Sequence, residues 1–201
     1  MKKILLIIII TLPFISLAQQ PKMNLKLIGG INTNSFIYQV EGAKADILTG
    51  WQIGAGVRVM KRKAFLEFDG LYQNYGTSFI PFQDSALNIN EPLDLRVRAL
   101  EFPITVGYIP VKTPLFKLFF YGGLVNKFSL NGRAKYFSEE ITFKPKEIDF
   151  HFYNLLARFG TQFDLAMFNF DLNYNIGVTN AIKNKARTNT NGIQLSVALL
   201  F

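Results

Sequence analysis

The sequence has no cysteine and only one histidine and one tryptophan among its 201 residues. Without cysteine, a disulfide framework and a cysteine-ligated metal site are both excluded, and a single histidine excludes a site built from several histidines. After residue 18 there is also no apolar run of the roughly 20 residues that a helical membrane span requires. If the chain resides in a membrane, it must therefore cross as a closed β-barrel, which satisfies every backbone group in lipid.

The first 18 residues have the composition of an export signal. Lys2 and Lys3 precede an apolar run over residues 4–15, and Ser16-Leu17-Ala18 places small residues before a cleavage site. This pattern predicts a secretory signal peptide over residues 1–18, cleaved after Ala18. An N-terminal membrane anchor is the alternative, but the run is short for one. Cleavage leaves a domain over residues 19–201 and lowers the formal net charge from +8 to +6.

Most of the remaining chain alternates between apolar and polar residues, as strands with two different faces do. The segment 168–178 alternates most regularly, with Phe170, Leu172 and Tyr174 on one face and Asn169 and Asp171 on the other. The predicted strands are about 23–32, 50–60, 64–75, 95–109, 116–128, 151–165, 168–178 and 192–201.

The connections between these strands alternate in length. Three are short, namely Lys61–Lys63, residues 110–115 and Ala166-Met167. The other four are long and cover residues 33–49, 76–94, 129–150 and 179–191. This alternation predicts an all-β fold, an eight-stranded antiparallel up-and-down transmembrane β-barrel with short periplasmic turns and long extracellular loops. A soluble lipocalin-like barrel is the alternative, but it would bury its apolar face inside.

One face of the predicted strands carries ionisable groups of both signs, which we expect to form a charge network in the lumen because buried charges must pair. This set comprises Lys26, Arg58, Glu67, Asp69, Arg98, Glu101, Lys117, Lys127, Arg158, Asp164 and Asp171. Keeping Arg98 and Glu101 on that face requires an extra residue near Ala99-Leu100, which a β-bulge would supply. The opposite face carries Trp51, Tyr72, Tyr108 and Tyr174, which suit the aromatic girdles of a membrane barrel.

Two segments resemble known sequence signals. The strand 192–201 has one wholly apolar face and ends on Phe201, and it resembles the C-terminal signal that the barrel-insertion machinery of the outer membrane recognises. The stretch from Arg98 to Tyr108, RALEFPITVGY, resembles a segment of the porin-family outer-membrane β-barrel domain, which includes porin-T-type proteins of gliding and type IX secretion. The resemblance implies a barrel in the outer membrane of a Gram-negative cell envelope, and no particular activity.

The sequence gives little support for catalysis. His151 lies in an aromatic stretch near the predicted outer rim, and Ser138 and Glu139 precede it, but no spacing joins them into a catalytic triad. We therefore expect that the protein is not an enzyme and carries no cofactor or metal.

The expected partners follow from the predicted compartment. Lys183, Lys185 and Arg187 form a basic loop, which would contact the phosphates of lipopolysaccharide or would simply be solvated. Outer-membrane lipid, the insertion machinery and envelope proteins are the predicted partners, and nucleic acid is not. Because eight strands leave an interior filled by side chains, we expect a membrane-anchored scaffold for four loops without a diffusion pore. The alternatives are an accessory component of a secretion or gliding machine, a narrow channel, and a lipid-modifying enzyme.

Overall fold

The computed structural model describes residues 21–33, 35–37, 45–79, 93–136, 139–143, 152–179 and 189–201, and every regular element in these ranges is a β-strand. The strands are β1 (Lys22–Asn32), β2 (Ser35–Ile37), β3 (Ala45–Lys61), β4 (Ala64–Phe79), β5 (Leu93–Lys112), β6 (Phe116–Tyr136), β7 (Glu139–Phe143), β8 (Tyr153–Leu165), β9 (Phe168–Gly177) and β10 (Asn189–Leu200). None of the described residues forms a helix with the length and apolar character to cross a membrane.

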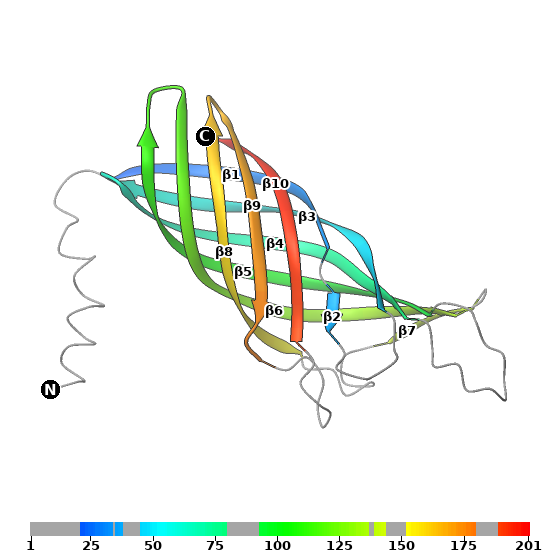
Figure 1. Cartoon of the computed structure of the whole chain (residues 1–201). Coiled ribbons are helices and arrows are strands. Elements are labelled where there is room, and N and C mark those ends of the chain that lie inside the picture. The colour runs from blue at the N-terminus through cyan, green and yellow to red at the C-terminus, as the bar shows by residue number, and fades with distance from the viewer. Residues whose placement is uncertain are drawn as a thin grey trace, which may run out of the picture.

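The long strands close into a barrel, as Figure 1 shows. The cycle of pairings contains eight of them. Each pairs antiparallel with its neighbour in the order β1-β3-β4-β5-β6-β8-β9-β10, and β10 returns to β1, where Leu27 pairs with Leu199. The predicted fold class is confirmed. Two short strands lie outside this cycle: β2 extends the sheet beside β10, and β7 pairs with the last residues of β6.

The two rims of the barrel differ in their connections (Figure 1). The turn rim carries the β3–β4, β5–β6 and β8–β9 turns, the start of β1 and the end of β10; the opposite rim is the loop rim. The turn after β3 is one residue shorter than predicted, because Lys61 pairs with Ala64 and only Arg62-Lys63 remain between them. Arg62 and Ala166 have φ values of 51° and 53°, the left-handed conformation that tight hairpin turns demand.

Alternation sorts the side chains between lumen and outer surface. On β8, Arg158 is 3% exposed whereas the next residue, Phe159, is 56% exposed. Trp51 and Tyr72 lie on the outer surface with ring centroids 5.6 Å apart. Inward glycines make room where long side chains meet, since a Cβ on Gly56 would lie 1.8 Å from Asp69 Oδ1.

The strands extend further toward the loop rim than the sequence indicates. β3 begins at Ala45 instead of residue 50, and β6 continues to Tyr136 instead of ending at residue 128. The β5–β6 ladder passes through polar pairs such as Asp94 with Lys135. Backbone pairing needs no apolar face, so a strand can continue after its amphipathic pattern stops.

The bulge predicted in β5 near Ala99-Leu100 is wrong. The extra residue lies in the neighbouring strand: Arg98 and Ala99 pair with residues 131 and 129 of β6, which leaves Leu130 without an opposite residue. β5 therefore keeps its alternation, with Val97, Ala99 and Glu101 all buried. Arg98 lies between them in sequence and consequently belongs to the outer face, which removes it from the predicted lumen set.

Candidate functional site

The lumen is the candidate site, because it gathers ionisable side chains in a space closed to solvent. Nine of the predicted residues are at most 8% exposed: Lys26, Arg58, Glu67, Asp69, Glu101, Lys127, Arg158, Asp164 and Asp171. A single unpaired charge in such a place would cost several kcal/mol. Their contacts divide most of them between two clusters.

The Glu67 cluster consists of Lys26, Arg58, Glu67, Asp69 and Asp164. Glu67 on β4 accepts hydrogen bonds from Lys26 Nζ at 2.5 Å and from Arg58 Nε at 2.6 Å. Lys26 also lies 3.1 Å from Asp69 Oδ1, and Arg58 Nη1 donates to Asp164 Oδ1 at 2.9 Å. The cluster thus joins β1, β3, β4 and β8 across the barrel.

Neutral amides supply further hydrogen bonds to this cluster. Gln162 accepts a hydrogen bond from Arg58 Nη2, and its Nε2 donates to Glu67 Oε1 at 3.1 Å and to Asp171 Oδ2 at 3.0 Å. Asn169 Nδ2 donates to Asp164 Oδ1 at 2.8 Å. These donors fill acceptor positions on the carboxylates that the cations leave open.

Asp171 on β9 is held by neutral donors. Tyr121 Oη donates to its Oδ1 at 2.7 Å, and Asn173 Nδ2 lies 3.4 Å from the same oxygen. Gln162 completes the set from β8. Asp171 therefore links the Glu67 cluster to the β9 side of the lumen through hydrogen bonds.

The Glu101 cluster consists of Glu101, Lys127, Arg158, Asn175 and Gln194. Arg158 Nη2 donates to Glu101 Oε2 at 3.0 Å and to Gln194 Oε1 at 2.9 Å, while its Nε donates to Asn175 Oδ1 at 2.8 Å. Lys127 Nζ lies 3.4 Å from Glu101 Oε1. One carboxylate thus meets two cations, and the cluster ties β5, β6, β8, β9 and β10 together.

An apolar plug closes the lumen next to the turn rim. Met60, Phe65, Ile109 and Phe119 pack together there and are at most 4% exposed. The guanidinium carbon of Arg58 lies 4.5 Å from the Phe119 ring centroid, so this cation also receives stabilisation from an aromatic face. Because Met60 pairs with Lys22 at the start of β1, the plug lies between Arg58 of the Glu67 cluster and the turn rim.

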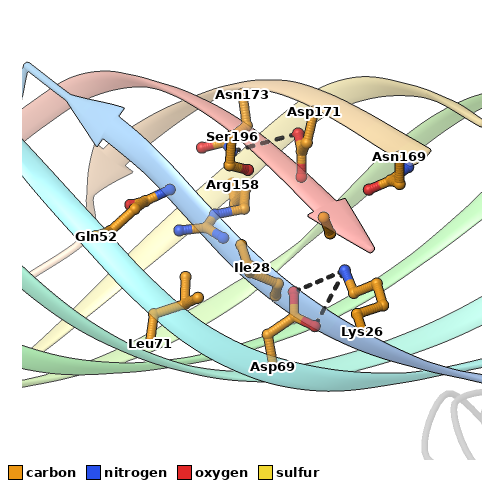
Figure 2. A pocket seen from close by; sticks show the side chains of 11 residues that line it. Lys26, Ile28, Gln52, Asp69, Leu71, Arg158, Asn169, Asp171, Asn173 and Ser196 are labelled. Carbon is orange, nitrogen blue, oxygen red and sulfur yellow. Dashed lines mark hydrogen bonds and ion pairs between the residues drawn. The ribbon is translucent and has the colours of Figure 1, made fainter. Parts of the chain in front are cut away.

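A small cavity of about 10 Å³ lies against both clusters. Figure 2 shows Lys26 and Asp69 on one side and Arg158 and Asp171 on the other. Gln52 also lines the cavity, is 2% exposed, and neither of its amide atoms has a hydrogen-bond partner within the described chain. The volume corresponds to about one water molecule.

The remaining predicted site residues lie in different surroundings. Lys117 is at the edge of the lumen, where its Nζ lies 3.7 Å from Asp164 Oδ2 and its side chain is 16% exposed. Phe201 is 66% exposed on the outer surface. His151 and Ser138, together with Lys183, Lys185 and Arg187, lie outside the described residues.

Sequence reasoning missed two parts of the lumen. It assigned the network to charged residues alone, although Gln162, Gln194 and Asn175 connect them. Strand alternation places these amides on the inner face. The large number of inward amides could have indicated that they take part in the network. The plug could not be predicted from alternation, because the inward residues Phe65 and Phe119 are apolar, as their outward neighbours are.

The chemistry available to the lumen is mutual neutralisation of charge. Among the described residues no group of three or more His, Cys, Asp or Glu is placed to hold a metal ion. Each buried acid is bonded to a cation or to neutral donors, and no serine, threonine or tyrosine hydroxyl is activated by a histidine in the described ranges. A polar network whose members are hydrogen-bonded in this way makes the interior rigid.

No protein-family profile and no curated protein matches this sequence. Solved structures do share its architecture. Neisserial surface protein A is 9% identical with a TM-score of 0.50, and the match covers 91% of this chain and 100% of that one. Ail, the attachment invasion locus protein of Yersinia pestis, is 14% identical with a TM-score of 0.48, over 90% of this chain and 99% of that one. The N-terminal β-barrel domain of Pseudomonas aeruginosa OprF is 11% identical with a TM-score of 0.42, over 90% and 100%. At 9% identity, the similarity to Neisserial surface protein A concerns the fold alone.

Proposed function

We propose that the protein is an integral outer-membrane β-barrel with a closed interior, which anchors the four connections of its loop rim at the cell surface. The observation that carries this proposal is the reversed polarity of the barrel. Ile53, Phe120 and Phe159 are more than 50% exposed on its outside, while Arg58 and Glu101 are fully buried inside. A soluble barrel requires the opposite arrangement, because exposing so large an apolar surface to water is unfavourable. The same surface is stable in contact with lipid.

The aromatic residues of the outer surface have the spacing of a membrane belt. Near the loop rim, the rings of Phe128 and Tyr153 lie 5.3 Å apart. Near the turn rim, Phe163 lies 6.3 Å from Phe116 and 4.7 Å from Phe170. Tyr153 and Phe163 are ten residues apart on β8, or about 33 Å along the strand at about 3.3 Å per residue. A strand tilt of about 40° reduces this to about 25 Å, the height of the apolar band in such barrels.

The filled lumen favours a scaffold over a channel. Two charged clusters span the interior and the apolar plug closes one end, so a solute would have to break buried ion pairs to pass. We therefore propose that the function resides in the loop rim, through contacts with lipopolysaccharide, for which Lys183, Lys185 and Arg187 are the candidates, or with envelope proteins. Export through the cleaved segment 1–18 and recognition of Phe201 by the insertion machinery belong to the same proposal.

The first experiment tests membrane residence and closure. Residues 19–201 are refolded into zwitterionic lipid vesicles and examined by heat-modifiable gel mobility, then by planar-bilayer recording. We expect a heat-modifiable barrel with negligible steady conductance. A large, stable open state would refute the closed interior and favour a channel. A monodisperse folded protein in water without detergent or lipid would refute the membrane barrel altogether.

The second experiment tests orientation. The chain contains no cysteine, so single cysteines can be introduced at Arg62 on the turn rim and at Ser85, between β4 and β5 in sequence. We expect an impermeant thiol reagent to label the Ser85 variant in intact cells, and the Arg62 variant only after the membrane is broken. The reverse pattern would overturn the proposed orientation.

A further inference from the structure

The turn rim carries a concentration of positive charge on one side of the barrel. This basic rim patch consists of Lys22, Lys61, Arg62, Lys63 and Lys112. Lys22 pairs with Met60 next to Lys61, so β1 and β3 bring their cations together. Lys112 Nζ donates to the carbonyl oxygen of Arg62 at 3.1 Å, which adds β5 to the same patch. Five cations from three strands and one turn thus lie at one margin of the barrel.

No exposed acidic side chain among the described rim residues offsets the patch. The described residues that form the rim are 21–24, 59–66, 108–118, 164–169 and 199–201, and Asp164 is the only acidic side chain among them. Asp164 is buried and receives Arg58 Nη1 at 2.9 Å and Asn169 Nδ2 at 2.8 Å. The Lys61 Nζ atom is buried, whereas Lys22, Arg62, Lys63 and Lys112 are exposed. These four cations are therefore available to an anion that approaches from the membrane margin.

An apolar hollow lies on the outer surface of β1, β3 and β4, which run side by side in Figure 1. Of these strands, β1 and β3 also contribute to the basic rim patch. It measures about 600 Å³. Leu27, Ala55 and Gly70 pair in one row across it, so two small residues form its floor beside the larger Leu27. Phe68 and Phe201 line it on the side of the turn rim.

The hollow and the patch are separated by the length of a lipid chain. Ala55 and Lys61 are six residues apart on β3, or about 20 Å along the strand at about 3.3 Å per residue. At a strand tilt of about 40° this is about 15 Å along the membrane normal, a little more than half of an apolar band about 25 Å high. A headgroup on the exposed Arg62 and Lys63, which follow Lys61 in the turn, would therefore place the end of its acyl chain near Ala55 and Gly70.

We propose that this surface binds one anionic glycerophospholipid from the leaflet that faces the turn rim, with its phosphate on the basic rim patch and one acyl chain in the hollow. The inference rests on the proposed membrane residence. The cations attract the headgroup, and the small side chains of Ala55 and Gly70 leave the space that a flexible chain can fill. Neither the basic rim patch nor the hollow alone would favour a phospholipid over other ligands, but the distance between them matches the length of an acyl chain.

The test uses site-specific fluorescence quenching by brominated lipids. Trp51 is the sole tryptophan, so a Trp51→Phe background allows one new probe. Val59→Trp places the probe on the outer face between patch and hollow. Phe168→Trp is the matched control, at the β8–β9 turn, where Leu165, Ala166 and Met167 carry no charge. Each variant is folded into mixed vesicles in which either phosphatidylglycerol or phosphatidylcholine is brominated.

At Val59→Trp we expect phosphatidylglycerol to bind more tightly than phosphatidylcholine by on the order of tenfold, and at Phe168→Trp we expect no more than about twofold. The triple change Arg62→Gln, Lys63→Gln and Lys112→Gln, which removes three exposed cations of the patch, should remove the preference. Gly70→Leu should also reduce it by filling the hollow. Its Cβ has room, since the nearest heavy atom, on Phe102, lies 3.7 Å away. Gly70→Ala, which adds a single methyl group, is the control.

Three outcomes would overturn the inference. Equal quenching by the two lipids at Val59→Trp would show no lipid selectivity. The same preference at both probe positions would indicate general attraction of a basic protein to an anionic membrane. Retention of the full preference in Gly70→Leu would show that no acyl chain occupies the hollow. Heat-modifiable mobility of every variant in zwitterionic vesicles keeps these outcomes separate from a failure of the membrane barrel itself.

Discussion

Replacing Glu67 with glutamine would remove one negative charge from the centre of the lumen while preserving its volume. Glu67 accepts hydrogen bonds from two cations, Lys26 at 2.5 Å and Arg58 at 2.6 Å, and is 2% exposed. Each charge-assisted bond of this kind contributes about 1.5–3 kcal/mol. In the variant, Lys26 still forms its ion pair with Asp69, and Arg58 still forms its ion pair with Asp164. Neither cation is therefore left unpaired. We therefore expect a loss near the lower end of the range for breaking a buried pair, about 3 kcal/mol.

The free energy of unfolding is measurable by urea titration of the barrel in lipid vesicles. The fluorescence of Trp51, the only tryptophan, reports the transition because its side chain lies on the outer surface at 47% exposure. Heat-modifiable gel mobility verifies that the starting state is a folded barrel. A double-mutant cycle with Lys26→Met supplies the control, since the loss from Glu67→Gln should shrink by about 1–2 kcal/mol when its partner is already absent.

A loss below about 0.5 kcal/mol for Glu67→Gln would refute this reasoning, because it falls within the error of additivity between independent sites. It would mean that water penetrates the Glu67 cluster and screens its ion pairs. The closed lumen, and with it the preference for a scaffold over a channel, would then lose its energetic basis.

Three further changes test other parts of the barrel. Val197→Arg places a charge on the outer face of β10, where Val197 is 42% exposed. The cost of about 2–4 kcal/mol should reduce the amount of heat-modifiable barrel in membrane fractions, whereas the control Val197→Leu should assemble normally. Equal assembly of the two variants would contradict the face assignment. Ala166→Gly should raise the free energy of unfolding by about 1 kcal/mol, because Ala166 has a φ of 53°; a decrease in urea titration would show that the turn is unstrained. Tyr121→Phe removes the 2.7 Å hydrogen bond to Asp171 and should lower stability by about 1.5–3 kcal/mol, whereas an unchanged urea midpoint would indicate that water replaces the hydroxyl.

The sequence was sufficient for the number of strands in the barrel, their antiparallel order and the face on which most side chains lie. These properties follow from local rules: the period of two along a strand is fixed by backbone geometry, and connection length decides which neighbours form hairpins. Asp171 and Phe170 could be assigned to opposite faces from their own strand alone. The same rules failed at Arg98, because the irregularity that determines register lies in the partner strand, at Leu130.

The pairing inside the lumen was decided only by closure of the barrel. Arg58 and Asp164 are 106 residues apart and meet at 2.9 Å because β3 and β8 face each other across the interior. Strand alternation gives a side for each residue, but the stagger between strands sets its height along the axis, and two inward charges interact only where their heights agree. The basic rim patch follows the same logic, since Lys22, Arg62 and Lys112 come from segments that become neighbours when β1, β3, β4 and β5 pair in register.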